Sequence, residues 1–328
     1  MEYTNLGRTG LKVSRLCLGT MNFGPRTTEP DSFAIMDRAL EHQINFFDTA
    51  DVYGWKVGEG VTESIIGRWF ATGGGRRDKV VLATKVYGKM SDWPNDSGLS
   101  ARHIVKACDE SLRRLQTDSI DLYQMHHVDR TAPWEEIWQA MSTLVQAGKV
   151  LYVGSSNFAG WHIAQAQATA KERNFLGLVS EQCIYNLMER TVELEVIPAA
   201  QHYGLGVIPW SPLHGGALSG MLRRQASGEA ARANEGRAKD TLDSHRDAIE
   251  AYEKLAGDLG VDAANLGLAW LLSRPGVTAP IIGPRTLGQL DGALGAFDVD
   301  LTDETLSHLD KLFPPVGKGG PGPEAWAW

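Results

Sequence analysis

Four residues of the chain carry side chains that could together move a proton: Asp48, Tyr53, Lys85 and His126. Asp48, Lys85 and His126 each stand at or next to the end of an apolar run typical of a buried strand, and Tyr53 follows Asp48 in the next loop. In a closed barrel of parallel strands, the carboxyl ends of the strands meet on one face. The pattern therefore predicts that a carboxylate, a phenol, an amine and an imidazole meet on that face.

These four groups suit the protonation of a carbonyl oxygen. A phenol ordinarily has a pKa near ~10, and a nearby cation lowers it by stabilising the phenolate. We expect Lys85 to be that cation, with Asp48 holding the ammonium charged and oriented. His126 is expected to donate a hydrogen bond to the substrate oxygen. Because no protein side chain donates a hydride, reduction of that carbonyl would require a nicotinamide or a flavin.

Taken one at a time, the four residues also have ordinary structural interpretations. Asp48 and Lys85 could form a structural ion pair, Tyr53 could be a loop aromatic, and His126 could be a hydrogen-bonded core histidine. Their shared position at the ends of strand-like runs favours a functional site over these separate interpretations.

The composition indicates an ordinary globular protein. Of 328 residues, 43% are hydrophobic and 22% are charged, and the net charge of -8 argues against binding to nucleic acid or to a membrane surface. The N-terminus lacks the features of a signal peptide, and no apolar run is long enough to span a membrane. Three scattered cysteines, Cys17, Cys108 and Cys183, predict buried free thiols in a reducing, cytoplasmic setting. No pair of them has metal-ligand spacing, so no metal site is expected.

Eight short apolar runs alternate with amphipathic stretches, as buried parallel strands alternate with helices. The runs are Leu16–Met21, Asn45–Ala50, Val80–Val86, Ile120–His126, Val150–Ser155, Leu178–Gln182, Val207–Trp210 and Thr278–Ile282. The pattern predicts an α/β fold of the (β/α)₈ TIM-barrel type, preceded by a β-hairpin over Tyr3–Val13. A doubly wound sheet is the alternative, but the chain has no G-x-G-x-x-G motif.

Helical spacing of apolar residues predicts the connecting helices. The expected helices include Ser32–His42, Arg102–Leu115, Pro133–Ala147, Ala263–Ser273, Thr286–Ala296 and Thr302–Leu312. After Trp210 the alternation breaks: residues 211–243 predict a long loop of the kind that often forms a lid, followed by an extra helix over Ser244–Gly260. We expect one domain over residues 1–328, with a Gly- and Pro-rich tail at 314–328. Gly73, Gly74 and Gly75 are expected to form a solvated turn.

The chain resembles the aldo-keto reductase family over almost its whole length. The motifs that carry the resemblance are Phe47-Asp48-Thr49-Ala50-x-x-Tyr53-Gly54, Lys85 at a strand end, Asp121-Leu122-Tyr123-Gln124-x-His126, Gly154-Ser155-Ser156-Asn157-Phe158, Gln182-x-x-Tyr185-Asn186, Pro209-Trp210-Ser211-Pro212-Leu213 and Ile282-Gly283-Pro284-Arg285-Thr286. The resemblance implies a catalytic tetrad of Asp48, Tyr53, Lys85 and His126. It also implies that NADPH lies extended at the carboxyl face of the barrel and gives a pro-R-type hydride to an aldehyde or ketone.

The resemblance further implies which residues contact the cofactor. Ser156, Asn157 and Gln182 would bond the nicotinamide carboxamide, and Trp210 would stack on the nicotinamide ring. Arg285 would pair with the 2′-phosphate and so select NADPH over NADH. The remaining expected contacts are Gly19, Thr20, Met21 and Asp48 at the nicotinamide end, Ser211, Pro212, Leu213, Gly215 and Gly216 at the pyrophosphate, and Gly283 and Gln289 near the adenosine. Arg237 in the long loop could clamp a phosphate or be a solvated arginine of the lid.

Three positions depart from the family pattern. Relatives often carry lysine where Met221 stands, and a carboxylate and an asparagine where Gly292 and Ala293 stand. These differences are expected to weaken cofactor binding and the strictness of the preference for NADPH.

The substrate pocket would come from loops that follow the strands. Trp55 and Trp93 are the main candidates, joined by Met21, by His127 and by Trp326 and Trp328 of the tail. His127 directly follows His126, so strand alternation predicts that it points toward the helices in a structural role.

The expected substrate is a small-molecule carbonyl compound. A reductase of nucleotide-linked deoxysugars is a narrower alternative. The family also includes channel-associated β subunits, so an NADPH-binding interaction module is an alternative of another class.

Overall fold

A computed structural model describes residues 1–226 and 236–316 of the chain. Eight strands form one parallel sheet in the order β10-β3-β4-β5-β6-β7-β8-β9. The strands are β3 (Cys17–Gly19), β4 (Phe46–Asp48), β5 (Val81–Val86), β6 (Ile120–Met125), β7 (Val150–Ser156), β8 (Leu178–Gln182), β9 (Gly206–Val207) and β10 (Ile281–Ile282). All eight predicted strands are confirmed, although β3, β4, β9 and β10 are shorter than the apolar runs that predicted them.

The sheet closes on itself between β9 and the segment that leads into β10. Val207 forms a parallel bridge with Val277. The N–H of Thr278 donates to the carbonyl of Val207 at 2.8 Å, and the N–H of Ile281 donates to that of Pro209 at 2.8 Å. The strands therefore form the predicted (β/α)₈ barrel.

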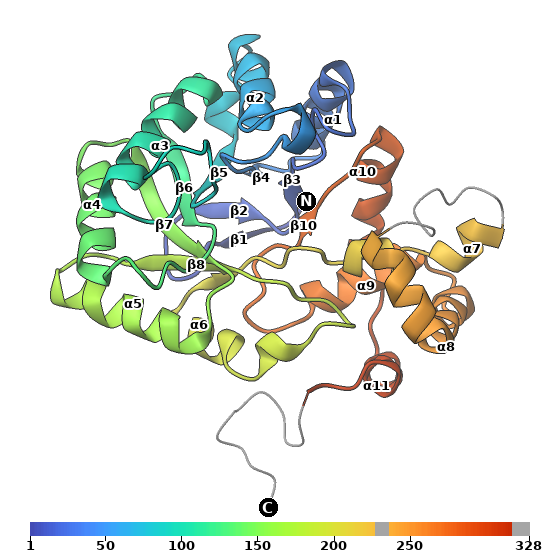
Figure 1. The fold of residues 1–328 in the computed structure, drawn as a ribbon. Helices are drawn as coiled ribbons and strands as arrows, with labels where there is room; N and C mark the ends of the chain where they lie inside the picture. The colour runs from blue at the N-terminus through green and yellow to red at the C-terminus, as the bar shows by residue number, and fades with distance from the viewer. Residues whose placement is uncertain (227–235, 317–328) are drawn as a thin grey trace, which may run out of the picture.

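Helices surround the barrel, as Figure 1 shows for α1 to α6. In the described residues the α-helices are α1 (Glu29–Glu41), α2 (Val61–Ala71), α3 (Ala101–Leu115), α4 (Trp134–Gln146), α5 (Gly160–Glu172), α6 (Val196–Tyr203), α7 (Met221–Ala226), α8 (Gly236–Asp258), α9 (Ala263–Leu272), α10 (Leu287–Ala293) and α11 (Asp303–Leu312). The helices predicted near residues 32–42, 102–115, 133–147, 263–273, 286–296 and 302–312 are confirmed, the fifth of them continuing as a 3₁₀ turn over Leu294–Asp298.

A β-hairpin of β1 (Tyr3–Asn5) and β2 (Lys12–Ser14) precedes the barrel, as predicted. Figure 1 shows it in the middle of the ring of strands. Leu6 and Val13 of this hairpin are fully buried in a cluster with inward-facing barrel residues such as Phe46 and Leu122. The hairpin therefore closes one end of the barrel core, which leaves the carboxyl ends of the strands as the place for a site.

The region predicted as a long loop is partly helical, which corrects that prediction. Helix α7 lies within it, and α8 begins at Gly236 instead of Ser244. Leu242 of the early part of α8 is buried with Met221 and Ile249, so the apolar face of the helix extends further toward its start than the sequence suggested. A kink at His245 (φ -134°) lies close to the predicted start. Part of the predicted lid, and the tail with Trp326 and Trp328, lie outside the described residues.

The remaining expectations concern single features. Cys17, Cys108 and Cys183 are buried free thiols, as predicted. The turn at Gly73, Gly74 and Gly75 is exposed and has positive φ angles. Within the described residues, no single helix is long and apolar enough to cross a membrane. One pair bent by 91°, Asp240–Asp258 with Ala263–Leu272, meets the criteria of length and composition only.

Helices α2 and α3 pack closely at Gly67, which yields a prediction. A Cβ at this position would lie 2.1 Å from the backbone oxygen of Arg114. Gly67→Ala should therefore lower the free energy of unfolding by roughly 1–3 kcal/mol, because the rigid helix backbone has to move. Gly257→Ala, near the end of α8, is the matched control: its Cβ would meet nothing within 4 Å. Urea denaturation should show the control equal to or up to about 1 kcal/mol more stable than the wild type. A stable Gly67→Ala variant would contradict the packing described here.

Candidate active site

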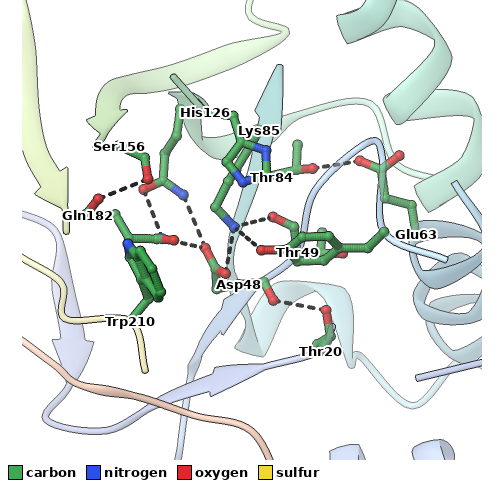
Figure 2. A network of polar contacts seen from close by, with 12 residues as sticks. Thr20, Asp48, Thr49, Glu63, Thr84, Lys85, His126, Ser156, Gln182 and Trp210 are labelled. Atoms are coloured by element: carbon green, nitrogen blue, oxygen red, sulfur yellow. Dashed lines mark hydrogen bonds and ion pairs between the residues drawn. The ribbon is translucent and has the colours of Figure 1, made fainter. Parts of the chain in front are cut away.

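The four residues singled out in the sequence lie together at the carboxyl ends of adjacent strands. Asp48 ends β4, Lys85 is the penultimate residue of β5, and His126 directly follows β6. Tyr53 reaches the same place from the loop after β4, where its N–H donates to the carbonyl of Ala50 at 3.2 Å. Figure 2 shows Asp48, Lys85 and His126 from neighbouring strands pointing into one space.

Lys85 is the centre of this cluster, and its side chain has no solvent exposure. Its Nζ donates to Asp48 Oδ2 at 2.7 Å, to the carbonyl of Thr49 at 2.8 Å and to Tyr53 Oη at 3.1 Å. An ammonium has three hydrogens, so all three are used. Because Tyr53 Oη accepts from Lys85, the hydroxyl hydrogen of Tyr53 remains available to donate to another group.

Lys85 and Tyr53 are both protonated at neutral pH, for different reasons. Burial opposes the charge on Lys85, but Asp48 and Tyr53 outweigh burial and raise the pKa of the ammonium above its ordinary value. Burial also raises the pKa of Tyr53, while the charge of Lys85 acts in the opposite direction. The predicted net lowering of the Tyr53 pKa is therefore wrong, because burial of the phenol outweighs the lysine. Tyr53 is a neutral phenol at neutral pH.

Asp48 is held by two glutamines on its other oxygen. Gln182 Nε2 donates to Asp48 Oδ1 at 2.8 Å, and Gln124 Nε2 donates to the same atom at 3.1 Å. The two amides also bond each other, since Gln182 Nε2 lies 3.3 Å from Gln124 Oε1. Sequence reasoning gave Gln124 no role. The available signal was its place two residues before His126, on the same face of β6.

His126 is a neutral imidazole beside the phenol. Burial, followed by the charges of Lys85 and His127, lowers the pKa of His126 to about 2. Its ring meets that of Tyr53 edge to face, with centroids 6.0 Å apart. A neutral imidazole carries one N–H, so His126 can donate a hydrogen bond without contributing a positive charge.

His127 lies on the same side as His126, which contradicts the predicted structural role facing the helices. Its ring is exposed and stacks on that of His126, with centroids 5.0 Å apart and planes within 8°. The alternation argument fails because β6 ends at Met125, before both histidines. Tyr87 meets the other edge of His127 at 5.3 Å.

A second group of polar side chains borders Asp48 at the ends of β7 and β8. Ser156 Oγ donates to the carbonyl of Gln182 at 2.8 Å, and Asn157 Nδ2 donates to Ser156 Oγ at 3.0 Å. The indole N–H of half-buried Trp210 donates to Asn157 Oδ1 at 2.9 Å. The structure thus brings together the four residues expected around a nicotinamide, and Figure 2 shows Ser156, Gln182 and Trp210 beside Asp48.

The other residues expected at the nicotinamide end have clear positions. Thr20 Oγ1 donates to the carbonyl of Asp48 at 2.8 Å. Gly19 is needed by the sheet itself, because a Cβ there would lie 2.5 Å from Ile281 on β10. Met21, at the same mouth, has 40% of its surface exposed.

The loop expected at the pyrophosphate follows Trp210. Ser211 (φ 54°) and Gly215 (φ 67°) have left-handed backbones, and the Gly215 N–H donates to Ser211 Oγ at 3.0 Å. Pro212 is buried and Leu213 is half-buried in this loop. Met221 stands where relatives often carry lysine, and it is buried in an apolar cluster. An uncharged methionine offers no positive charge to a phosphate. Arg237 falls in the first turn of α8, but its side chain lies outside the described residues.

The residues expected at the adenosine end surround the start of α10. Arg285 is half-buried, and its guanidinium has no ion pair in the part of the chain that the structure describes. Gln289 Oε1 accepts from the backbone N–H of Arg285 at 2.8 Å. The carbonyl of Gly283 accepts from Asn22 at 2.9 Å, a link that the sequence did not predict. Gly292 and Ala293 lie on α10, as the departures from the family pattern.

The two tryptophans expected in the substrate pocket are not packed together. Trp55, in a 3₁₀ turn over Trp55–Val57, is 47% exposed, and its ring contacts the guanidinium of Arg26 at 5.5 Å. Trp93 is 79% exposed. No aromatic contact joins Trp93 to another ring within the described residues, so this structure gives it no place in a formed pocket wall.

Comparisons with known proteins find relatives along nearly the whole chain. The sequence profile of the aldo/keto reductase family matches residues 15–313. An uncharacterized oxidoreductase, YrpG of Bacillus subtilis (strain 168), is 55% identical over 333 aligned residues that cover 100% of both chains. A versiconal hemiacetal acetate reductase of Aspergillus parasiticus is 34% identical, with 96% of this chain and 98% of the relative covered. A probable voltage-gated potassium channel subunit beta of Oryza sativa subsp. japonica is also 34% identical, with 95% and 96% covered.

Because the Asp48–Lys85 pair is buried, the effects of substituting its two residues on the free energy of unfolding should be strongly coupled. Asp48→Asn or Lys85→Met alone should lower the free energy of unfolding by roughly 3–5 kcal/mol, because each leaves the other charge buried without its partner. The double variant should lower the free energy of unfolding by clearly less than the sum of the two single-variant effects. The exposed pair Lys254 and Asp258 is the matched control and should show coupling of about 0.5 kcal/mol or less. Additive effects at Asp48 and Lys85 in urea denaturation would mean that the two charges do not depend on each other.

Proposed function

The chain belongs to the aldo/keto reductase family, and we propose that it is an NADPH-dependent reductase of aldehyde or ketone carbonyls with Tyr53 as the proton donor. One observation carries this proposal. Lys85 donates its three hydrogens to Asp48, Thr49 and Tyr53. The hydroxyl hydrogen of a neutral Tyr53 is therefore free to donate beside a neutral His126. That arrangement suits protonation of a carbonyl oxygen that is gaining negative charge.

Each residue of the site has a defined part in the proposed reaction. His126 donates a hydrogen bond that orients and polarises the carbonyl. Tyr53 gives its proton to the carbonyl oxygen as that oxygen becomes an alkoxide. The ammonium of Lys85 stabilises the phenolate that remains, and Asp48 keeps this ammonium charged and in place. A bound nicotinamide would supply the hydride, since no side chain can.

The residues present fit a phosphorylated nicotinamide cofactor. Ser156, Asn157 and Gln182 present amide and hydroxyl groups beside Asp48, and Trp210 offers a half-buried ring whose N–H is anchored on Asn157. Arg285 has no carboxylate partner in the described chain, so its guanidinium is available to a phosphate. These features support NADPH, while buried Met221 supports weaker binding at the pyrophosphate than relatives with lysine would have.

The names of relatives bear on the substrate in a general way. Oxidoreductases and a reductase of a hemiacetal acetate are among them, which supports a small-molecule carbonyl substrate. A nucleotide-linked deoxysugar is a narrower alternative within the same chemistry. The three buried thiols support a cytoplasmic location as part of the proposal.

A binding role is the alternative of another class. Proteins named as channel β subunits share 34% identity with this chain, so an NADPH-binding interaction module is conceivable on sequence grounds. The arrangement of Tyr53, Lys85 and His126 favours the reductase, because a module that only binds has no need of a free phenol hydrogen. Purified protein that binds NADPH but leaves it unconsumed with aldehydes, diketones and keto-sugars would favour the module.

Removal of the phenol hydroxyl tests the proton donor. Tyr53→Phe should lower kcat for carbonyl reduction by at least about a hundredfold, because it removes the acid, and should leave NADPH binding nearly intact. Loss of NADPH absorbance measures turnover, and calorimetry measures binding. Tyr3→Phe on the distant hairpin is the matched control and should behave as the wild type. Comparable turnover by Tyr53→Phe would remove Tyr53 as the acid.

Truncation of Arg285 tests the choice of cofactor. Arg285→Ala should raise the Kd for NADPH by roughly tenfold or more, because a charged hydrogen-bonded partner of the 2′-phosphate is lost, and should change the Kd for NADH little. Arg113→Ala, at an exposed site in the last turn of α3, controls for the loss of one positive charge. If Arg285→Ala weakened both cofactors equally, the 2′-phosphate would have to lie elsewhere.

A further inference from the structure

Glu181 is a buried carboxyl for which the proposed reaction has no use. It directly precedes Gln182 near the end of β8, and its side chain has no solvent exposure. Successive residues of a strand point to opposite sides, so Glu181 points away from the face on which Gln182 meets Asp48. No lysine, arginine or histidine whose side chain the structure describes forms an ion pair with it. A carboxylate buried in this way without a cation is costly, so the group needs another explanation.

The contacts of Glu181 can be satisfied with the group un-ionised, and it is burial that opposes the carboxylate, which would accept the same hydrogen bonds. The backbone N–H of Phe158 donates to Oε1 at 3.0 Å, and Oε2 contacts Ser155 Oγ. Ser155 Oγ also lies 3.3 Å from the carbonyl of Ser180. If Glu181 carries its proton, it donates to Ser155 Oγ, which in turn donates to the carbonyl of Ser180, so both hydroxyl hydrogens have an acceptor. If Glu181 is ionised, Ser155 has to turn its hydrogen toward the carboxylate and gives up Ser180.

The two contacts of Glu181 enclose the turn that carries Ser156 and Asn157. Ser155 precedes these residues at the end of β7, and Phe158 follows them before α5. Asn157 has φ of 60°, a left-handed conformation that needs support from its surroundings. The backbone of Gln182 supports this turn as well, accepting from the Asn157 N–H at 2.9 Å. Figure 1 shows β7 and β8 side by side in the barrel, as their pairing requires.

We propose that Glu181, as an un-ionised acid, is a positioning residue that fixes the turn presenting Ser156 and Asn157 to the cofactor. Ionisation of Glu181 would put an unpaired charge in this fully buried position, and the turn would have to open to water to solvate it, so the protein would hold NADPH less tightly in alkaline solution. The inference rests on the proposed function, because it takes Ser156 and Asn157 as contacts of the nicotinamide. It adds a pH response that the tetrad alone does not supply, since Tyr53 and Lys85 stay protonated and His126 stays neutral.

The titratable groups Cys183 and His162, which lie near Glu181, keep their charge states over the same pH range. Burial raises the pKa of Glu181 to about 8, against opposing hydrogen bonds from Ser155 and the backbone of Phe158 and Asn157. The neighbouring thiol of Cys183 has its pKa raised well above the ordinary value, by burial and then by Glu181. His162, whose ring contacts Phe158, has its pKa lowered by burial, so it is neutral throughout the alkaline range.

The binding test compares the wild type with Glu181→Gln, which keeps the size and hydrogen bonds of the acid but cannot ionise. The Kd for NADPH is measured by calorimetry from about pH 6.5 to about pH 9.5. At pH 7 the two proteins should bind NADPH alike. Above pH 8 the wild-type Kd should rise by up to about tenfold per pH unit, as release of one linked proton requires, while Glu181→Gln lacks this rise. Glu172→Gln, at the exposed end of α5, is the matched control and should follow the wild type.

A second measurement needs no cofactor. Because the folded pKa of Glu181 lies above its ordinary value of 4.5, the native wild type binds an extra proton between these values. Its thermal midpoint should therefore fall relative to that of Glu181→Gln as the pH rises from about 5 to about 8, and the difference should then stay constant.

The outcomes separate the two proposals. If the wild type binds NADPH but shares its whole pH dependence with Glu181→Gln, the role of Glu181 is overturned and the reductase proposal stands. Equal midpoint profiles in the second measurement would likewise overturn the un-ionised state. If the wild type binds no NADPH at any pH, the proposed function is overturned and the role of Glu181 with it.

Discussion

The site depends on one constraint, which is that the ammonium of Lys85 is entirely buried and still charged. A buried charge has to be matched by an opposite charge and by enough hydrogen-bond acceptors. Asp48 supplies the charge, and Thr49 and Tyr53 complete the acceptors. The position of the phenol and the direction of its free hydrogen follow from this requirement. The same pair therefore supports the local fold and positions the phenol that we propose as the proton donor.

Several strands of the barrel contribute residues that surround the buried Asp48–Lys85 pair. Parallel pairing sets Asp48 beside Ala83 and Lys85 beside Gln124, so β4, β5 and β6 converge at the pair. Gln124 and Gln182 then occupy the carboxylate oxygen that Lys85 leaves free. The terminal hairpin fills the opposite end of the barrel, so the polar network lies at the carboxyl end of a well-packed apolar core. The turn held by Glu181 continues the network to the neighbouring strands.

Much of this arrangement could be predicted from the sequence, because apolar runs of strand length ended at residues with chemical functions. The strands, the hairpin and the meeting of Asp48, Tyr53, Lys85 and His126 all followed from that pattern. The orientation of His127 did not, because alternation holds only inside a strand and β6 ends two residues earlier. The net effect on the Tyr53 pKa was also missed, since burial of the phenol depends on tertiary packing. Glu181 carries no sequence signal of its own, as its burial and its partners arise only when β7 and β8 pair.

In the proposed reaction, a hydride from the cofactor reaches the carbonyl carbon and a proton from the site reaches the carbonyl oxygen. The most direct test is reduction of a panel of aldehydes, diketones and keto-sugars with NADPH that carries deuterium at the pro-R hydrogen of the nicotinamide C4. Mass spectrometry of the alcohol products locates the label. We expect one deuterium on the former carbonyl carbon and no exchange with solvent at that carbon. Products without deuterium from NADPH labelled at either C4 hydrogen, or no product from any carbonyl while NADPH is bound, would rule out this reaction.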